Sequence, residues 1–362
     1  MSQTVFVGLS GGVDSGTSAA ILKERGYDVV GVFIKIWQPE FIECTWREDR
    51  LDALRIAASL GIPFREIDLS QEYKQEVVDS MVRDYERGIT PNPDVLCNEK
   101  IKFGAFARWA FANGADLIAT GHYARAEYTS QTCAEHKSDL CRPHLLRGAD
   151  TNKDQSYFLY RIRGEDLART LFPIGNLSKP QVRERARSFG LPVAQKPDSQ
   201  GLCFVGDVTM RDFLARFITL KPGSVLDTNG KVIGAHEGAS LYTIGQRHGF
   251  TTNTASTHNE VHYVISISIK DNSITVSPDR TLAEVCEITL RDTHWIGDTP
   301  VFPLKTLAQS RYRETPFPVT IEQSHREIIA RFDEPHLVSS GQSLVLYDDT
   351  RTLGGGIIKR NT

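Results

Sequence analysis

The feature that most restricts the fold of this chain is a glycine-rich segment, Ser10–Ser15 (SGGVDS), just after the apolar run Thr4–Gly8. An apolar run, a glycine turn and then the amphipathic stretch Gly16–Arg25 predict a strand–loop–helix unit. Adjacent glycines can adopt positive φ, so that several backbone N–H groups point at one anion. Serine hydroxyls and the partial positive charge of the helix N-terminus strengthen such a cradle. The segment therefore predicts a binding site for nucleotide phosphates.

The same segment lacks the Gly-Lys-Ser/Thr ending of the P-loop in kinases and GTPases, and it does not match Gly-x-Gly-x-x-Gly. Without that lysine, transfer of the terminal phosphate is disfavoured as the reaction. A tight turn with a Ser or Asp helix cap is the alternative interpretation. The position between a strand and a helix favours the nucleotide site.

The rest of the first 205 residues alternates between apolar runs and amphipathic stretches, which predicts a parallel sheet with helices on both faces. A polar segment near 129–148 interrupts this pattern and is expected to be a surface insertion. We expect strands at Thr4–Gly8, Asp28–Ile36, Phe64–Asp68 and Asp116–Ala119. We expect helices at Gly16–Arg25, Arg50–Leu60, Ile101–Asn113, Gln155–Arg163 and Lys179–Phe189.

After about residue 205 the pattern changes to the alternation of β-strands. The runs 264–269 and 274–276, and again 343–347 and 353–359, predict two β-hairpins. We therefore expect three domains, namely an α/β catalytic domain over 1–205, a small β-rich domain over 206–280 and a β-barrel over 281–362.

The six cysteines, at positions 44, 97, 133, 141, 203 and 286, are too sparse for a disulfide scaffold. Each could be a core residue, a metal ligand or a reactive thiol. Cys97 follows a proline-rich loop and precedes the helix expected at Ile101–Asn113, and a helix N-terminus can lower the pKa of a thiol. Asp94 lies close enough in sequence to act as a general base or to orient a substrate.

Cys203 lies in the polar turn Asp198–Phe204. For Cys97 or Cys203 alone, a buried small apolar residue is the alternative interpretation. Cys44 and Cys286 are interpreted as structural. Within the expected insertion, four residues have spacings that could hold a tetrahedral zinc, and a loop that merely contains them is the alternative. These zinc candidates are Cys133, His136, Cys141 and His144.

Motifs spread from residue 4 to about 358 resemble the bacterial tRNA-specific 2-thiouridylases of the ATP pyrophosphatase (PP-loop) superfamily. The resemblance implies an adenine-nucleotide alpha-hydrolase-like domain with a parallel sheet, a small β-rich linking domain and a C-terminal β-barrel. It also implies an ATP-dependent enzyme that replaces the C2 oxygen of the wobble uridine of tRNA with sulfur. The motifs are Ser10–Ser15, Asn92–Asn98, Ala119–Tyr123, Lys153–Leu159, Asp198–Phe204, Tyr242–Arg247 and Leu353–Gly356.

The resemblance also implies roles for individual residues. A sulfur-relay protein or cysteine desulfurase delivers sulfur to Cys203 as a persulfide. ATP, accompanied by Mg²⁺, adenylates the uridine before sulfur attacks. Cys97 is the nucleophile, and it ends the cycle in a disulfide with Cys203. The residues implied to bind ATP are Gly8, Leu9, Ser10, Gly11, Gly12, Val13, Asp14, Ser15, Ile34 and Gly121.

A further set of residues is implied to contact the tRNA or its target base. Aromatic and arginine side chains in this set suit base stacking and phosphate contact. Arg183, Arg185 and Arg187 could also contact phosphates, but the interleaved Glu184 favours a solvated helix face. The implied tRNA contacts are Asn92, Pro93, Asp94, His122, Lys153, Asp154, Gln155, Arg311, Tyr312 and Gln342.

Besides the insertion near 129–148, the sequence departs from this family at two places. Ile34 stands where the family usually has Met, which is expected to alter only the packing around the adenine. Thr251–His258 replaces a glycine-rich loop, so the conformation of this loop or its contact with tRNA is expected to differ.

The sequence has no run of about 18 apolar residues and no basic-then-apolar leader, so we expect a cytoplasmic protein without a membrane span. A net charge of −3 requires that RNA be bound through a local basic surface. A monomer is the simpler expectation. One alternative function is an ATP pyrophosphatase that forms an amide or guanidino bond, and another is an RNA-binding module that merely retains the nucleotide loop. Both cysteines and the intact loop favour thiolation.

Overall fold

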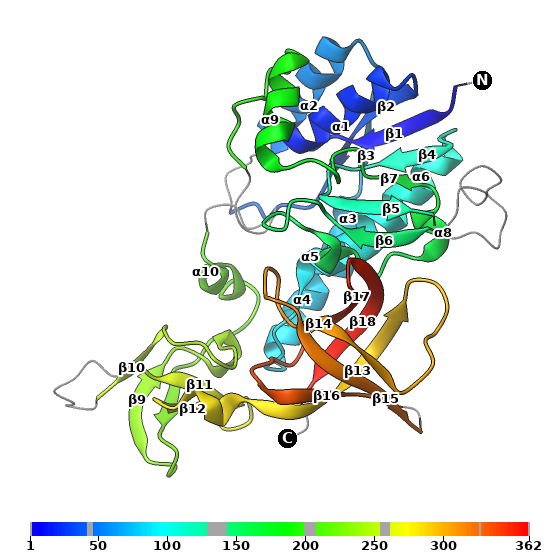
Figure 1. Ribbon diagram of the computed structural model, residues 1–362. Helices are drawn as coiled ribbons and strands as arrows, with labels where there is room; N and C mark the ends of the chain where they lie inside the picture. The colour runs from blue at the N-terminus through cyan, green and yellow to red at the C-terminus, as the bar shows by residue number, and fades with distance from the viewer. Residues whose placement is uncertain are drawn as a thin grey trace.

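The computed structural model describes residues 2–41, 46–128, 143–198, 208–253, 261–325 and 327–360. Five cysteine or histidine residues singled out by the sequence lie outside these ranges, namely Cys44, Cys133, His136, Cys141 and Cys203. The described chain is organised around three sheets, with the N-terminal part uppermost and the two β-rich parts side by side below it (Figure 1). No helix in these ranges is long and apolar enough to span a membrane.

The first sheet is parallel throughout and has the strand order β3-β2-β1-β4-β7. This confirms the predicted parallel sheet. The strands predicted at Thr4–Gly8 and Phe64–Asp68 have the predicted bounds, and the other two differ by a residue at one end. The strands are β1 Thr4–Gly8, β2 Asp28–Lys35, β3 Phe64–Asp68, β4 Leu117–Ala119 and β7 Thr170–Leu171.

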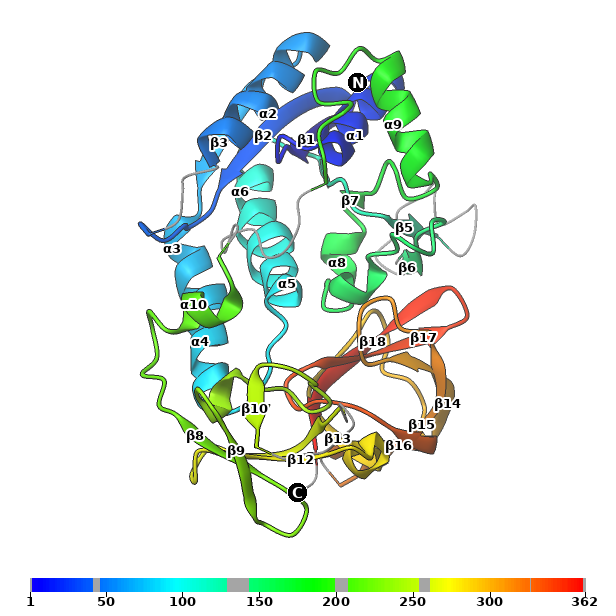
Figure 2. The same cartoon turned by 90° about the vertical axis from the view of Figure 1, so that its left-hand side faces the viewer.

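Helices cover both faces of this sheet. Successive side chains of β1 point in opposite directions, so each face has its own apolar residues for a helix to pack against. Val5 and Val7 pack into one core with α1 (Val13–Glu24), α2 (Trp46–Leu60) and α9 (Lys179–Ser188). Phe6 packs into the other core, against a column of two neighbouring helical segments that Figure 2 shows running down toward the other two sheets. The column contains α3 Ser70–Tyr73, π-helix η1 Lys74–Val78, α4 Asp79–Glu86, α5 Pro93–Leu96, π-helix η2 Cys97–Phe106 and α6 Ala107–Ala112.

Two helix predictions need correction. The helix expected at Ile101–Asn113 begins eight residues earlier, at Pro93, because proline suits the first turn of a helix and Asn92 accepts a hydrogen bond from Val95 N. The helix expected at Gln155–Arg163 is wrong, since only the 3₁₀ turn η3 (Ser156–Leu159) forms there. Short helices follow at α8 Gly164–Leu167 and α10 Met210–Leu214, and 3₁₀ turns at η4 Ala239–Leu241 and η5 Arg280–Ala283.

The second sheet has the order β10-β9-β8-β12-β11, and its β11–β12 hairpin confirms the prediction for 264–276. Thr251 and Thr252 belong to β10 and pair with β9, whereas residues 254–258 of the Thr-rich loop lie outside the described residues. The strands are β8 Gly223–Leu226, β9 Val232–His236, β10 Phe250–Thr252, β11 Tyr263–Ser268 and β12 Ser273–Ser277.

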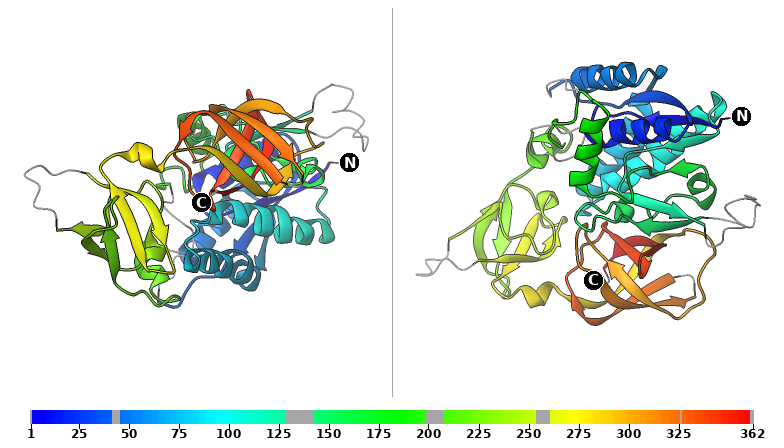
Figure 3. Two further views of the ribbon diagram at one scale, coloured as in Figure 1. Left: turned by 90° about the horizontal axis from the view of Figure 1, so that it is seen from below. Right: turned by 45° about the horizontal axis from the view of Figure 1, so that its top comes forward.

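The third sheet closes on itself, because β13 pairs with both β16 and β18. This confirms the predicted C-terminal barrel, whose closed outline is visible in Figure 3. Its interior is apolar and includes Ile288, Ile321 and Leu344. The strands are β13 Val285–Trp295, β14 Leu304–Gln309, β15 Phe317–Ser324, β16 Glu327–His336, β17 Ser343–Asp348 and β18 Arg351–Lys359.

A hairpin from the N-terminal part extends the barrel sheet. Strand β5 (Ala124–Glu127) pairs with β6 (His144–Arg147), and β6 pairs with the beginning of β18. Leu145 of β6 is fully buried. The insertion expected near 129–148 is therefore too long at its C-terminal end, and its residues 129–142 lie outside the described ranges.

A buried aromatic cluster joins the helical column to the barrel. It contains Val95 of α5, Tyr157 of η3, Tyr160, and Val345 and Tyr347 of β17. The Tyr157 hydroxyl lies 3.2 Å from the carbonyl oxygen of Ser310 and 3.0 Å from that of Ser343. One side chain from the N-terminal part thus lies within hydrogen-bond distance of backbone acceptors on two barrel segments.

Replacement of this tyrosine tests the junction. Tyr157→Phe removes the donor and leaves buried carbonyl groups unsatisfied, so we expect a loss of about 1–2 kcal/mol in the free energy of unfolding. Urea denaturation measures it. Tyr263→Phe, at a half-buried position in β11, is the control and should change stability by less than about 0.5 kcal/mol. Equal effects of the two substitutions would contradict a stabilising role of the Tyr157 hydroxyl at the junction.

Candidate functional site

The glycine-rich loop lies between β1 and α1, as the sequence predicts. Gly11 has φ +75°, and the backbone of Asp49 occupies the space where a Cβ atom would lie, so only glycine fits. Ser15 Oγ accepts a hydrogen bond from Ser10 N at 3.2 Å and donates to Gly12 O at 3.1 Å. These bonds fix the loop as a rigid turn at the N-terminus of α1.

Two distant residues of the expected nucleotide site meet this loop. A Cβ atom on Gly121 would lie 2.7 Å from Ser15 N, so the strand end after β4 packs directly against the first turn of α1. Ile34 of β2 lies beside Gly8, with its Cδ1 3.7 Å from the position of a Cβ there. The structure therefore brings the loop, Ile34 and Gly121 together at the carboxyl ends of neighbouring parallel strands, the usual ligand position in such sheets.

Asp14 is the centre of a polar cluster that the sequence did not predict. Its carboxylate accepts hydrogen bonds from the Tyr123 hydroxyl at 2.9 Å and from the Lys179 ammonium at 2.8 Å. Burial raises the pKa of Tyr123, and the negative charge of Asp14 raises it further, so the phenol remains a proton donor. Lys179 comes from α9, 165 residues from Asp14.

Asp198, five residues before Cys203 in the sequence, lies next to this cluster. Lys153, Lys179 and Arg183 approach its carboxylate at 2.7, 2.7 and 2.8 Å. Burial alone would raise the pKa of Asp198, but the hydrogen bonds from Lys153 and Lys179 outweigh it and lower the pKa to about 2. Asp198 is therefore ionised throughout the neutral range.

The three arginines of α9 differ in their surroundings. Arg183 donates to Asp198, and Arg185 forms an ion pair with Glu24 of α1, while Arg187 is exposed. Arg183 and Arg185 thus hold α9 to its neighbours. The predicted phosphate contacts of this run remain a prediction.

Cys97 occupies the first position of π-helix η2 and is partly buried. It does not precede a helix, as expected, but lies four residues after the helix start at Pro93. Asp94, one turn earlier, is partly buried, and burial raises the pKa of its carboxyl group against the opposing effect of Lys102. A carboxyl group of raised pKa suits proton transfer near neutral pH.

His122 is 7% exposed and lies close to the same helix. Its Nε2 is 3.2 Å from the Lys102 ammonium, and its Nδ1 is 2.7 Å from the Thr120 hydroxyl. Burial lowers the pKa of His122 well below its usual value, and Lys102 lowers it further. The imidazole is therefore neutral and accepts from Lys102 at Nε2. Lys102 was missed by the sequence interpretation, although it lies five residues after Cys97.

The residues implied to contact RNA fall into two groups. Asp154 is 6% exposed and accepts hydrogen bonds from Arg147 Nε, Gly148 N and Ser156 N, so its carboxylate shapes the protein. Gln155 accepts from Tyr123 N in the same way. For these two residues, the predicted RNA contact competes with bonds inside the chain.

The barrel residues of the same set lie close to the Asn92–Asp94 turn. Gln342 Nε2 donates to the carbonyl oxygens of Thr90 and Pro91, at 2.9 and 3.0 Å. The Tyr312 ring lies 4.6 Å from that of Phe158, within the cluster that includes Val95. Arg311 is exposed. The structure thus places Gln342 and Tyr312 beside the segment implied to meet the target base.

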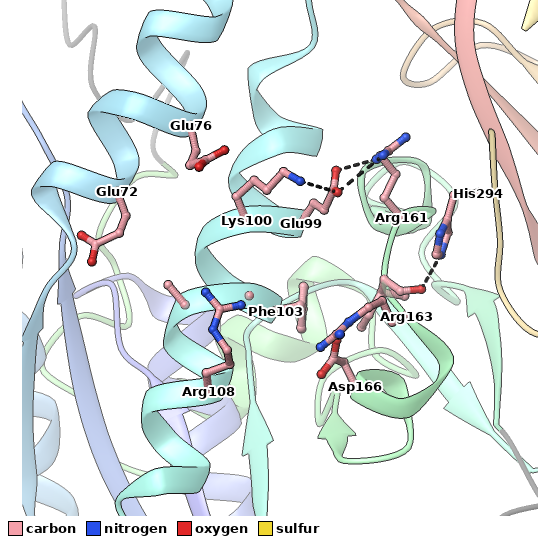
Figure 4. A pocket seen from close by; sticks show the side chains of 13 residues that line it. Glu72, Glu76, Glu99, Lys100, Phe103, Arg108, Arg161, Arg163, Asp166 and His294 are labelled. Carbon is pink, nitrogen blue, oxygen red and sulfur yellow. Dashed lines mark hydrogen bonds and ion pairs between the residues drawn. The ribbon is translucent and has the colours of Figure 1, made fainter. Parts of the chain in front are cut away.

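A charged cavity of about 370 Å³ lies on another side of η2 (Figure 4). Glu99 accepts from Lys100 at 2.9 Å and pairs with Arg161 at 2.5 Å, and His294 Nε2 lies 2.9 Å from Ile162 O. Its lining residues include neither Cys97 nor the glycine-rich loop. The contacts join η2 to the barrel, and the cavity is separate from the nucleotide site.

The zinc prediction concerns residues that lie mostly outside the described ranges. Only His144 is described, at the start of β6, and burial lowers the pKa of its imidazole. Among the residues that the structure describes, no group of three His, Cys, Asp or Glu side chains could hold a metal ion. The zinc site therefore remains a prediction.

The low pKa of Asp198 gives a prediction for stability. Because this pKa is about 2 in the folded protein and 3.8 in the reference state, the ionised form stabilises the fold above about pH 4 by about 2 kcal/mol. This contribution is lost as pH falls from about 4 through 2. Asp198→Asn should therefore be less stable than the parent at pH 7, with the difference shrinking below pH 4. Urea denaturation across this range measures it, with Asp28→Asn at an exposed position as control.

Comparison with known proteins covers almost the whole chain. Family models match in order: the tRNA methyl transferase HUP domain over residues 3–207, the tRNA methyl transferase PRC-barrel domain over 211–278, and the Aminomethyltransferase beta-barrel domain over 285–358. The tRNA-specific 2-thiouridylase MnmA of Pediococcus pentosaceus is 40% identical over 364 residues, which span 98% of this chain and 94% of that protein.

Two further relatives carry the same name. That of Akkermansia muciniphila is 41% identical over 362 residues, with 98% of each chain covered. That of Aliivibrio fischeri is 41% identical over 366 residues, covering 98% of this chain and 97% of that protein. With this identity over nearly its full length, and with the glycine-rich loop and Cys97 in place, the chain belongs to the tRNA-specific 2-thiouridylase family.

Proposed function

We propose that this protein catalyses the ATP-dependent 2-thiolation of the wobble uridine of tRNA, with release of AMP and pyrophosphate. The observation that carries the proposal is the combination of a phosphate cradle without its own lysine and a partly buried Cys97 one helical turn after Asp94. The first suits nucleotide activation of a substrate oxygen, and the second suits sulfur chemistry beside a proton acceptor.

Activation comes first because the C2 oxygen of uridine is a poor leaving group. This oxygen attacks the α-phosphorus of ATP, the bond from that phosphorus to the bridging oxygen breaks, and pyrophosphate leaves with the electron pair. The N3 proton of the base passes to Asp94, whose raised pKa suits it as acceptor. Neutral His122, held by Thr120 and Lys102, offers an uncharged edge to the base.

Sulfur transfer follows. A persulfide on Cys203 carries the sulfur, and the Cys97 thiolate attacks the inner sulfur of that persulfide. A Cys97–Cys203 disulfide forms and hydrosulfide is released. Hydrosulfide adds to C2, AMP departs with the former C2 oxygen, and an external thiol reductant then restores both cysteines. The target base must leave the anticodon stack to reach these groups.

The proposal extends to partners and conditions. A sulfur-relay protein or cysteine desulfurase supplies the persulfide, and Mg²⁺ accompanies ATP. Among the implied tRNA contacts, exposed Arg311 and partly exposed Lys153 and Tyr312 have side chains that suit phosphate binding and stacking. We propose a cytoplasmic monomer.

Methyl transfer to tRNA is a second candidate, because two of the matching family models carry that description. Methyl transfer consumes no ATP and requires no thiol pair. The glycine-rich loop, rigid and preformed at a helix N-terminus, favours the ATP-dependent reaction.

A thiolation assay tests the proposal. Purified protein is incubated with ATP, Mg²⁺, unmodified tRNA and either sulfide or a protein persulfide donor, and the nucleosides are analysed by mass spectrometry. We expect ATP-dependent 2-thiouridine, reduced at least 100-fold by Cys97→Ser with the persulfide donor. Cys203→Ser should lose activity with the persulfide donor and keep it with sulfide.

Cys286→Ser is the matched control, because Cys286 is exposed on β13 of the barrel, and it should retain full activity. AMP formation without thiolated tRNA would indicate an adenylating enzyme whose substrate is not this uridine. Methylated tRNA in the presence of a methyl donor, without AMP, would support the second candidate.

A further inference from the structure

The nucleotide loop has no cation of its own. Across Gly8–Ser15 the one charged side chain is Asp14, which is negative. The N-terminus of α1 contributes only about half a unit of positive charge, whereas the triphosphate of ATP carries several negative charges. The remaining positive charge must come from a bound metal ion or from another element of the fold.

Lys179 meets this requirement. Its ammonium lies 2.8 and 2.9 Å from the two carboxylate oxygens of Asp14 and 2.7 Å from Asp198 Oδ1. The side chain is only 12% exposed. Helix α9 lies beside α1 in the fold (Figure 1), so the ammonium is brought to the first turn of α1.

The backbone of Lys179 is fixed from both sides. The preceding Ser178 forms a capping box with Gln181, and Lys179 N donates to Asp150 Oδ2 at 2.9 Å. With this anchor the flexible stem alone is free to turn, and it can move the ammonium a short distance from Asp14 toward a phosphate while Asp198 remains in contact.

Other lysines near the loop form ion pairs or hydrogen bonds with other groups. Lys196 binds Asp49 and Asp52 of α2, at 2.8 Å each, and Lys23 donates to Leu60 O at the far end of α1. Within the described ranges, Lys179 is the lysine whose ammonium contacts a side chain of the loop.

We propose that Lys179 binds the terminal phosphates of the nucleotide and stabilises the pyrophosphate that leaves, with Asp14 and Asp198 as positioning residues. The assignment rests on the proposed function. An ammonium is a compact point charge suited to phosphate. The leaving pyrophosphate takes the electron pair of the broken phosphorus–oxygen bond, and the Lys179 ammonium lies close enough to the loop to bind it. The loop thus obtains from α9 the lysine that its own sequence lacks.

Binding of inorganic pyrophosphate tests this assignment without the thiolation reaction. Calorimetry at fixed Mg²⁺ compares the affinities of the full-length protein for pyrophosphate, ATP and adenosine. Lys179→Met should weaken pyrophosphate binding at least 10-fold and change adenosine binding less than twofold. Lys179→Arg, which keeps the charge, should recover part of the loss. Arg185→Met is the matched control, because Arg185 is on the same helix and pairs with Glu24 instead.

The outcomes separate the alternatives. Unchanged pyrophosphate affinity in Lys179→Met would overturn the assignment, and so would an equal loss of pyrophosphate and adenosine binding, which indicates a purely structural role. A parent protein that binds neither ATP nor pyrophosphate would overturn the proposed function together with this assignment. Normal binding by the parent protein, selective loss in Lys179→Met and no thiolated tRNA would overturn the proposed function alone.

Discussion

The hydrogen bonds of Thr90 and Pro91 hold the three sheets in one arrangement. Thr90 N donates to Ser340 O at 3.1 Å, and the Thr90 hydroxyl lies 2.8 Å from that of Thr243 in the central domain. Gln342 of the barrel donates to both carbonyl groups. Because Asp94 and Cys97 follow within seven residues, the position of the reactive thiol depends on all three parts of the chain. A buried backbone segment without secondary structure needs such partners to be stable.

The charged groups of the site are divided by their surroundings. Asp14 and Asp198 both form ion pairs with Lys179, beside the phosphate-binding loop. Asp94 and His122 lie in a drier region where burial favours their neutral forms. One part of the site therefore consists of ion pairs, and the other contains groups that suit proton transfer. Lys102 contacts His122, and its charge acts to lower the pKa of both His122 and Asp94, against the effect of burial in the case of Asp94.

The features that could be predicted from the sequence are those that depend on residues close together along the chain. The strand at Phe64–Asp68 and the glycine-rich loop are local patterns and were identified correctly. The helix expected at Gln155–Arg163 fails because Asp154 and Gln155 bond to the backbone of their surroundings, which replaces helical bonds. The ion pair of Asp14 with Lys179 spans 165 residues, and only the packing of α9 on α1 reveals it. The family resemblance named Cys97, Asp94 and Lys153 as site residues, but not Lys102 or Lys179.

The β5–β6 hairpin determines where this chain can be divided. Although its residues precede the barrel by more than a hundred positions, they complete the open edge at the beginning of β18. A shortened chain that ends after the N-terminal domain would expose the edge of β6, and unpaired edges favour aggregation. A barrel produced alone would lack the same cover at Arg351 and Thr352. Gene fusion or exchange of these parts between relatives is therefore constrained to keep the hairpin and the barrel from one parent.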